Sequence, residues 1–480
     1  MKKTNPAYKW WLLALMMVST AMAILDTTIV NSVIPALLRE FHSSLLSVEW
    51  IVTGYLLSMC VMLPTAGWLA EKYGFKLIYI MGMGCFTLGS LFCYLSETLG
   101  TLIFSRVIEG FGSGVVQSLG LAIIIRNFDL KHRTIALGLW GVAAAAAVSM
   151  GPYMGGEMLG LYGWNSLFGV NVPIGILNII GAALIMQETK DKNAGRFNLK
   201  GFILTALWAP LLVVGLSMGV SKGEGWLTGW SSPFVIVSLI SSVVMGYGFI
   251  RYNSHSLTPI IDLRIFKDKT FLLSIVALGC LGFGFYGGNY LLPLYLEHSL
   301  SYSAVVVGGI YLPVGIVQGT LAPLSGLMAQ RWGEWRLVII GFAIFVLYLA
   351  LSIFYTQNTP YWLILTTVYM RGVGLGLAFT PLNALCVKNL TKEQMTSASG
   401  VNNTVKQVSG SLGIAIFTAI IATRLTDDKS LAESISMSDY TSSIDYSFLI
   451  ATIFAAAGLI SLLFIRQRGK SLKVTSKKSN

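Results

Sequence analysis

Two segments of this chain repeat nearly the same sequence 259 positions apart: PTAGWLAEKYG, which begins at Pro64, and PLSGLMAQRWG, which begins at Pro323. Each copy follows a long apolar run and ends with a basic residue close to a glycine. Such repeats indicate an internally duplicated helical unit, typical of membrane carriers whose ligand path lies between the two halves. The copies are eight apolar segments apart, so a duplicated six-helix unit requires two further helices between its halves.

Long apolar runs make up most of the chain. Of the 480 residues, 55% are hydrophobic and only 11% are charged. A soluble protein of this size could not bury that much apolar surface, and uncharged runs of about 20 residues are typical of transmembrane helices. We therefore predict an all-α polytopic membrane protein with two six-helix halves and two inserted central helices. The fourteen predicted spans are 10–33, 47–70, 77–95, 99–124, 135–158, 164–187, 200–220, 232–250, 271–296, 303–329, 336–355, 361–385, 403–423 and 446–465.

The basic residues gather on one side of these spans. Of the 33 Lys and Arg residues, two lie within spans (Arg106 and Arg371) and four in outward loops, which leaves 27 on the inward side. Because Lys and Arg collect in cytoplasmic loops, both termini are predicted to be cytoplasmic. Membrane orientation thus explains the formal net charge of +12, and we expect no nucleic-acid partner.

The predicted spans divide the chain into four parts. These are the N-terminal six-helix half (1–187), the linkers with the two extra helices (188–270), the C-terminal six-helix half (271–466) and a basic cytoplasmic tail (467–480). The four histidines have no metal-ligand spacing, and all five cysteines fall within predicted spans. We find no nucleophile–base set, so we expect neither enzymatic activity nor a bound metal.

Three ionisable residues within spans are expected at the same depth. Asp26 lies about 24 Å above Trp10 on the first span, which rises from the cytoplasm. Arg106 and Glu109 are one turn apart on the fourth span, which descends, and Arg106 lies about 10 Å below Leu99. In a hydrocarbon core about 30 Å thick, these positions agree within about one helical turn.

Charged side chains within a membrane are costly and mark functional sites. One polar stripe on the fourth span consists of Arg106, Glu109, Ser113 and Gln117. Our functional hypothesis is a proton-coupling site at Asp26, Arg106 and Glu109, because two acids beside one arginine leave a negative charge that a proton can neutralise. The alternative is a static ion pair that holds the first span against the fourth.

The fifth span carries the glycine- and proline-rich segment AVSMGPYMGG, which begins at Ala147. Pro152 removes a backbone donor, while Gly151, Gly155 and Gly156 permit close approach of another helix. We predict a gate at these four residues. The alternative is a simple packing kink, since Gly and Pro are frequent in membrane spans.

Isolated polar residues on apolar spans are weaker candidates for a substrate cavity. They are Gln117, Tyr286, Asn289 and Gln318. Each is equally consistent with a polar contact between helices, so both interpretations stay open.

Several of these segments carry a family resemblance. In the first half they are LDTTIVNSVIP (25–35), PTAGWLAEKYG, RVIEG (106–110), AVSMGPYMGG and FGVNVPIG (168–175), and in the second half LTPIIDLRIFKDKTF (257–271) and VKQVSGSLG (405–413). Together they resemble the fourteen-span drug:proton antiporters of the major facilitator superfamily, the EmrB/QacA-like group. The resemblance runs from about residue 10 to residue 420.

The resemblance implies roles for particular residues. Asp26 matches an aspartate implicated in coupling, Arg106 an arginine linked to proton transfer, and the segment around Pro152 a seal that marks exporters. A cytoplasmic latch that holds the halves in one conformational state is implied for Gly67, Glu71, Lys72, Gly74 and Lys76. The sequence departs from the family pattern at Glu71, Glu109 and Ala147, and Glu109 adds a second titratable group where glutamine is usual.

The implied function is proton-driven export of small amphipathic or lipophilic compounds, including antibiotics, across the bacterial cytoplasmic (inner) membrane. Protons are the coupling ion, and no cofactor is expected. We expect a monomer working within the lipid bilayer, and leave open whether a periplasmic adaptor protein joins its outward face. The alternatives are export of an endogenous metabolite, lipid or siderophore by the same antiport mechanism, and a transport-inactive membrane sensor or scaffold.

Overall fold

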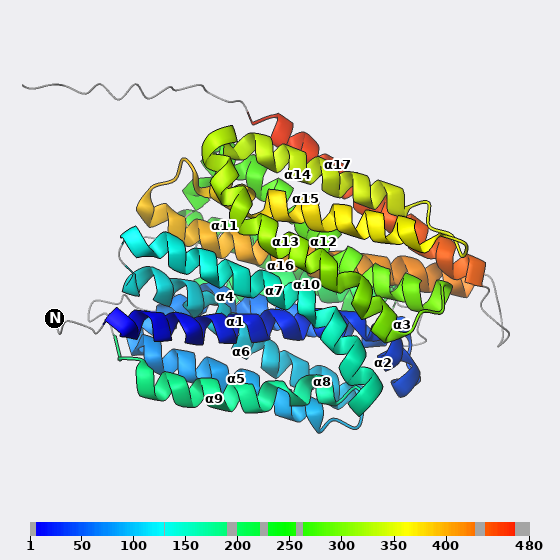
Figure 1. Ribbon diagram of the computed structural model, residues 1–480, viewed down its shortest axis with the longest axis horizontal. Helices are drawn as coiled ribbons and strands as arrows, with labels where there is room; N and C mark the ends of the chain where they lie inside the picture. The colour runs from blue at the N-terminus through cyan, green and yellow to red at the C-terminus, as the bar shows by residue number, and fades with distance from the viewer. Residues whose placement is uncertain are drawn as a thin grey trace, which may run out of the picture.

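Long helices run side by side through the molecule (Figure 1). The computed structural model describes residues 6–128, 130–189, 199–220, 229–255, 263–427 and 437–465. A helix satisfies its backbone hydrogen bonds internally, which is the condition for crossing a lipid bilayer. The elements are α1 (Pro6–Ser32), α2 (Ile34–Phe41), α3 (Leu45–Val48), α4 (Trp50–Tyr73), α5 (Phe75–Tyr94), α6 (Leu99–Asn127), α7 (Leu130–Tyr162), α8 (Ser166–Gly169), α9 (Asn171–Ile185), α10 (Leu199–Val220), α11 (Pro233–His255), η1 (Leu263–Lys267), α12 (Lys269–Leu294), η2 (Tyr295–Ser299), α13 (Ala304–Trp332), α14 (Glu334–Ser352), α15 (Tyr361–Val387), α16 (Lys392–Asp427) and α17 (Met437–Leu463).

Thirteen helical segments in these ranges are long and apolar enough to cross a membrane. The remaining predicted span, 135–158, corresponds to α7, whose apolar stretch is the shorter Leu139–Val148. α7 packs extensively against α1 and α13 and so belongs to the same bundle. The predicted fold class is therefore confirmed.

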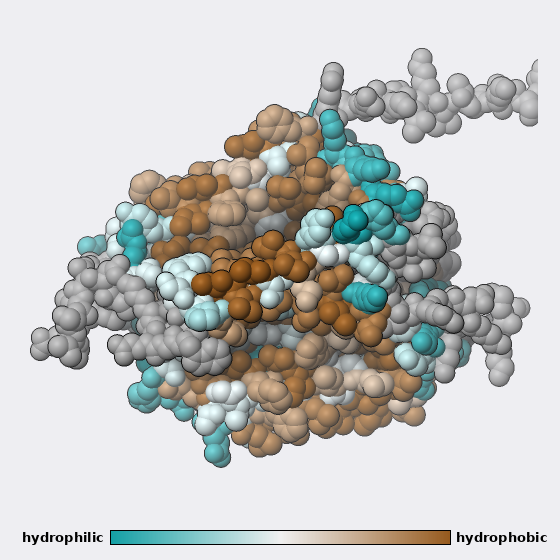
Figure 2. Space-filling model, turned by 180° about the vertical axis from the view of Figure 1, so that it is seen from behind, coloured by the Kyte–Doolittle hydropathy of each residue, from teal (hydrophilic) through white to brown (hydrophobic). Residues whose placement is uncertain are grey.

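The outer surface fits a lipid environment. On α11, the side chains of Val243 and Tyr247 are 70% and 66% exposed. Figure 2 shows apolar residues across much of one face, with hydrophilic residues toward its margins. Exposed apolar area of this extent is unfavourable in water and favourable against lipid. The chain is a multi-pass membrane protein.

Three of the predicted spans correspond to helices with clearly different bounds or breaks. The predicted span 164–187 is divided into α8 and α9, and Pro173 lies in the first turn of α9, where a missing N–H is tolerated. The predicted span 271–296 passes from α12 into the π-helix η2 at Tyr295, two residues after Pro293, whose ring removes one backbone hydrogen bond. The predicted span 403–423 lies within a longer helix, α16, which begins at Lys392 and ends at Asp427. The predicted basic tail, 467–480, lies outside the described residues.

The duplicated segments adopt the same backbone conformation. Gly74, between α4 and α5, has φ +117°, and Gly333, between α13 and α14, has φ +85°. Glycine populates this region readily and other residues do not. Packing repeats as well, since α6 lies against α4 and α5 as α15 lies against α13 and α14. The four-part domain division stays a prediction.

The repeated units meet mainly where α7 packs on α13 and α4 packs on α16. The inserted α10 packs on α11 and also reaches α4 and α16. There the Ser217 hydroxyl donates to Glu49 Oε1 (3.3 Å), a buried carboxylate at the start of α4. At the end of the bundle opposite the termini, Arg39 Nη2 lies 3.4 Å from Glu297 Oε2 and bridges the two repeats.

Candidate functional site

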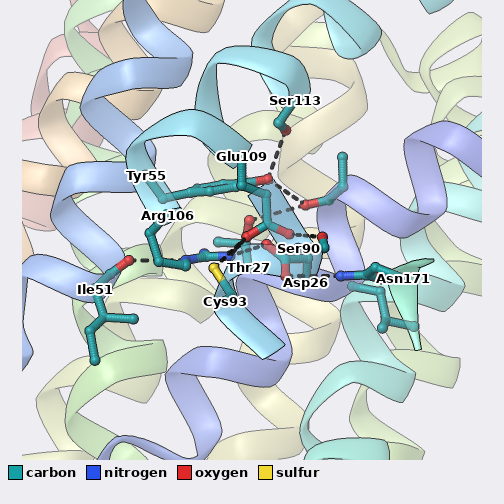
Figure 3. Close-up of polar contacts among 12 residues, drawn as sticks. Asp26, Thr27, Ile51, Tyr55, Ser90, Cys93, Arg106, Glu109, Ser113 and Asn171 are labelled. Atoms are coloured by element: carbon teal, nitrogen blue, oxygen red, sulfur yellow. Dashed lines mark hydrogen bonds and ion pairs between the residues drawn. The ribbon is translucent and has the colours of Figure 1, made fainter. Parts of the chain in front are cut away.

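Asp26, Arg106 and Glu109 meet inside the first repeat (Figure 3). Arg106 and Glu109 lie three residues apart on α6 and therefore face the same way. Asp26 comes from α1, the neighbouring helix. The three residues are 2%, 0% and 0% exposed in that order along the chain. The structure thus brings together the three residues that the sequence places at one depth.

One guanidinium nitrogen serves both acids. Arg106 Nη1 lies 2.5 Å from Asp26 Oδ2 and 2.6 Å from Glu109 Oε2. Its Nε donates to the carbonyl of Ile51 on α4 at 3.2 Å, and its Nη2 has no hydrogen-bond partner in the part of the chain that the structure describes. Because this nitrogen carries two N–H groups, it can donate to both carboxylates at once, while Nη2 of the same cation stays unused.

Neutral groups hold each carboxylate in place. Asn171 Nδ2 donates to Asp26 Oδ1 at 3.2 Å. The Ser90 hydroxyl donates to Glu109 Oε1, and the Cys93 thiol lies 3.6 Å from Glu109 Oε2. These donors come from α5 and α9, so together with α1, α4 and α6 five helices of the first repeat converge on the site. Such contacts orient the acids without changing their charge.

The guanidinium also lies against aromatic rings. Its centre is 4.1 Å from the ring centroid of Tyr55 and 5.6 Å from that of Phe168. Cation–π contact partly compensates a desolvated cation. The Tyr55 hydroxyl donates to Ser113 Oγ at 2.7 Å and links the site to the rest of the polar stripe on α6.

Charge counting shows what the arrangement can do. With both acids ionised, the three groups carry a net charge of −1, and with one proton bound they are neutral. A buried net charge is costly. The site can therefore exist with or without one proton, and separation of α1 from α6 changes which state is favoured.

The predicted gate residues lie where α7 meets its neighbours. A Cβ added to Gly151 would lie 2.0 Å from Thr28 Oγ1 on α1, and one added to Gly156 would lie 2.3 Å from the carbonyl oxygen of Ala304 on α13. Gly155 is buried, and the carbonyl of Pro152 faces α13. Close packing around this segment is thus observed within the first repeat and between the repeats, while the gating role stays a prediction.

The contacts described for the predicted latch lie within the first repeat. Lys76 Nζ donates to the Ala183 carbonyl at 2.5 Å, and Glu188 accepts the backbone N–H of Lys76 at 3.2 Å. A Cβ on Gly74 would clash with the Glu188 side chain. Lys72 lies over the Trp68 ring, 4.8 Å from its centroid. Of the other two, Glu71 is exposed and Gly67 has no neighbour within 4 Å of an added Cβ. The latch role stays a prediction.

The predicted cavity residues take part in separate contacts. Gln117 Nε2 donates to Ser113 Oγ at 3.2 Å, Tyr286 packs against Gly410, and Asn289 accepts from Arg371. Gln318 is partly buried on α13. A cavity of about 250 Å³ lies elsewhere, between α10 and α16. A substrate cavity at these four residues stays a prediction.

Sequence reasoning missed several residues that hold the site. Asn171 lies in the segment FGVNVPIG that supports the family resemblance, so a signal for it was present. Ser90 and Cys93 are small residues on an apolar helix and gave no signal. Outside this site, Arg371 is one of the two arginines within the predicted spans, and the sequence alone assigns it no role.

A duplicated bundle of membrane-spanning helices with a buried acid–arginine site defines a membrane transporter built from two helical repeats. The chain belongs to the Major Facilitator Superfamily, whose family model matches residues 16–414.

Relatives extend over nearly the whole chain. It is 29% identical over 459 residues to the uncharacterized MFS-type transporter YhcA of Bacillus subtilis (96% of this chain, 84% of YhcA). It is 28% identical to the probable multidrug resistance protein EmrY of Escherichia coli (91% and 83%) and 26% identical to the riboflavin transporter RibZ of Clostridioides difficile (97% and 99%). The partially occluded inward-open structure of the xylose transporter XylE from E. coli has the same fold, with a TM-score of 0.62 at 12% identity over 97% of this chain and 100% of XylE.

Proposed function

We propose that this chain is a proton-coupled efflux transporter, a drug:proton antiporter that exports amphipathic or lipophilic compounds. The observation that carries the proposal is the single Arg106 nitrogen shared by Asp26 and Glu109 in a fully buried site. Relatives named as multidrug resistance proteins support the substrate class.

The mechanism uses the proton as the coupling ion. A proton taken from the outward side binds Asp26 or Glu109 and releases that carboxyl from Arg106. The remaining ion pair then reorganises as α1 moves relative to α6. The two halves rock about the close contact between α7 and α13, with the gate at Gly151, Pro152, Gly155 and Gly156. Proton binding in the outward-facing state accompanies release of substrate to the outside, and the proton leaves on the cytoplasmic side once the halves have returned to the inward-facing state.

The setting we propose is the bacterial cytoplasmic membrane, with both termini in the cytoplasm. The transporter works as a monomer, since each chain contains both repeats and one coupling site. A periplasmic adaptor at the outward face is compatible with this arrangement and is not required by it.

A second candidate is export of an endogenous metabolite by the same antiport mechanism. One relative is named a riboflavin transporter, which favours a small metabolite as an alternative substrate. The coupling site would then be the same, and the difference would lie in the substrate cavity.

Substitution of Asp26 by asparagine tests the coupling role. In proteoliposomes with an imposed pH gradient, we expect D26N to reduce export of a panel of cationic, neutral and anionic dyes to the background of protein-free liposomes. The control is E97Q, the same change at an exposed acid in the loop between α5 and α6, which should match the unmodified protein. Equal melting temperatures show that both variants fold. Full gradient-driven export by D26N would remove Asp26 from the mechanism.

A further inference from the structure

The second repeat contains a counterpart of the coupling site. Asp26 is twenty residues past Pro6, where α1 begins, and Asn289 is twenty residues past Lys269, where α12 begins. Arg106 lies on α6, the third long helix after α1, and Arg371 lies on α15, the third after α12. Arg371 Nη2 donates to Asn289 Oδ1, as Arg106 Nη1 donates to Asp26. Both arginines are buried, with Arg371 2% exposed.

The counterpart lacks the acids. An amide stands at position 289 where the first repeat has a carboxylate, and the α14 side chain near Arg371 is the hydroxyl-bearing Tyr348. Within the described ranges, no carboxylate lies within 4 Å of Arg371 as a salt-bridge partner. A buried cation without a counter-charge is expensive, and its usual remedy is a bound anion or a paired acid.

The hydroxyl and amide groups around Arg371 are neutral. By hydrogen-bond geometry its Nε and Nη1 have no partner in the described part of the chain, and neither do the hydroxyls of Tyr311 and Tyr348, although both hydroxyls lie close enough to interact with the guanidinium. A tyrosine hydroxyl can accept as well as donate, but it carries no negative charge, so what the cluster lacks is an anionic acceptor. A cationic ligand would be repelled.

Aromatic rings form the walls of this cluster. The guanidinium centre is 5.1 Å from the ring centroid of Tyr311 and 5.9 Å from that of Phe285. Phe285 is the partly exposed member of the set, and its ring contacts that of Tyr286 edge-on at 5.1 Å. A ligand with an acidic group and an aromatic or aliphatic body would satisfy both parts, the acid at Arg371 and the body along Phe285.

We propose that Arg371, Tyr311 and Tyr348 form a binding site for the carboxylate of an exported amphipathic acid. The ligand carboxylate accepts from the Arg371 nitrogens that Asn289 leaves without a partner, Nε and Nη1. The inference rests on the proposed efflux function and specifies a substrate class for it. A carboxylate is favoured over a halide because its two oxygens can accept from the guanidinium and the hydroxyls together.

A matched pair of probes tests the site: 2-naphthoate and its neutral analogue 2-naphthamide. Binding is measured as the shift in melting temperature of the purified, full-length protein in nanodiscs, and export as gradient-driven movement from proteoliposomes. R371Q should weaken naphthoate binding and export at least about tenfold, as expected for loss of a charged hydrogen bond. Binding and export of naphthamide should change less than about twofold.

Two further variants keep the test decisive. N289D retains the arginine and supplies an internal carboxylate. This variant should therefore also lose naphthoate binding while folding normally. R424Q removes an exposed arginine that lies over the Tyr446 ring, 3.3 Å from its centroid, and should behave as the unmodified protein.

Several results would overturn the inference. The first is an equal loss of naphthoate binding and naphthamide binding in R371Q. The second is unchanged naphthoate binding in N289D. The third is an increase in the melting temperature of the unmodified protein with chloride but not with naphthoate. Arg371-dependent naphthoate binding without gradient-driven export of any probe would support the site and contradict the efflux function. Export of naphthamide alone would support the efflux function and contradict the site.

Discussion

The two repeats place a buried arginine at corresponding positions and surround it differently. In the first repeat, Arg106 contacts two carboxylates through one nitrogen. In the second, Arg371 contacts one amide and leaves two nitrogens without a partner in the described structure. Since the backbone framework is duplicated, the difference lies in the side chains alone. This difference is the basis of both proposals: that the first copy, which supplies its own anions, exchanges a proton, and that the second takes its anion from a ligand.

The largest effect that this comparison predicts is on stability. R106Q leaves two buried carboxyl groups without their cation and should lower the free energy of unfolding by about 3–5 kcal/mol. R371Q leaves no acid unpaired and should cost about 1 kcal/mol or less, since mainly a hydrogen bond to Asn289 is lost. Unfolding of both variants in mixed micelles measures the difference. Similar losses would show that the repeats do not differ in the way proposed.

Some residues of the two arginine sites can be predicted from the sequence and others cannot. Asp26, Arg106 and Glu109 are charged residues in apolar runs, and helical rise alone puts them at one depth. Glycines at the ends of α4 and α13 could be predicted from the duplicated segments. Ser90 and Tyr348 could not, because an ordinary residue on a helix reveals neither its partner nor its direction until the helices pack.

A second prediction concerns the glycines at which α7 and α16 pack closely against their neighbouring helices. Gly151 is twenty-one residues into α7 and Gly413 twenty-one residues into α16. An added Cβ would lie 2.0 Å from Thr28 Oγ1 in the first case and 2.8 Å from the Phe283 carbonyl oxygen in the second. G151A and G413A should each therefore lower the free energy of unfolding by about 1–3 kcal/mol.

The controls for this prediction are G141A and G400A on the same two helices. An added Cβ at either position has no neighbour within 4 Å. Both variants should be neutral or slightly stabilising, because alanine favours a helix over glycine. Loss of stability only in the first repeat would show that the duplicated packing is not equivalent.

A third substitution makes the two sites more alike in charge. E109Q removes the surplus acid, so the first site becomes neutral with no proton bound. Loading a proton should then require more acidic solution, and the export rate against pH should shift toward lower pH, with a several-fold lower rate near neutrality. Export from proteoliposomes over a range of pH measures this shift, with E97Q as the isosteric control. An unchanged profile would show that Glu109 takes no part in coupling.

The smallest effect is expected at the ion pair that joins the repeats. Arg39 is 62% exposed and Glu297 only 3% at their side chains, and Glu297 Oε1 has no partner among the described residues. Because the Arg39 end of the pair is solvated by water, E297Q should change stability by no more than about 1 kcal/mol, and R39Q should cost somewhat more. The two losses should differ, because R39Q leaves a buried carboxylate unpaired, whereas E297Q leaves an arginine that water already solvates. Melting temperatures of the two variants and of the double variant measure this asymmetry. A larger loss in E297Q would mean that the carboxylate has a second role beyond the bridge, and the rocking of the halves would then depend on more than their packed helices.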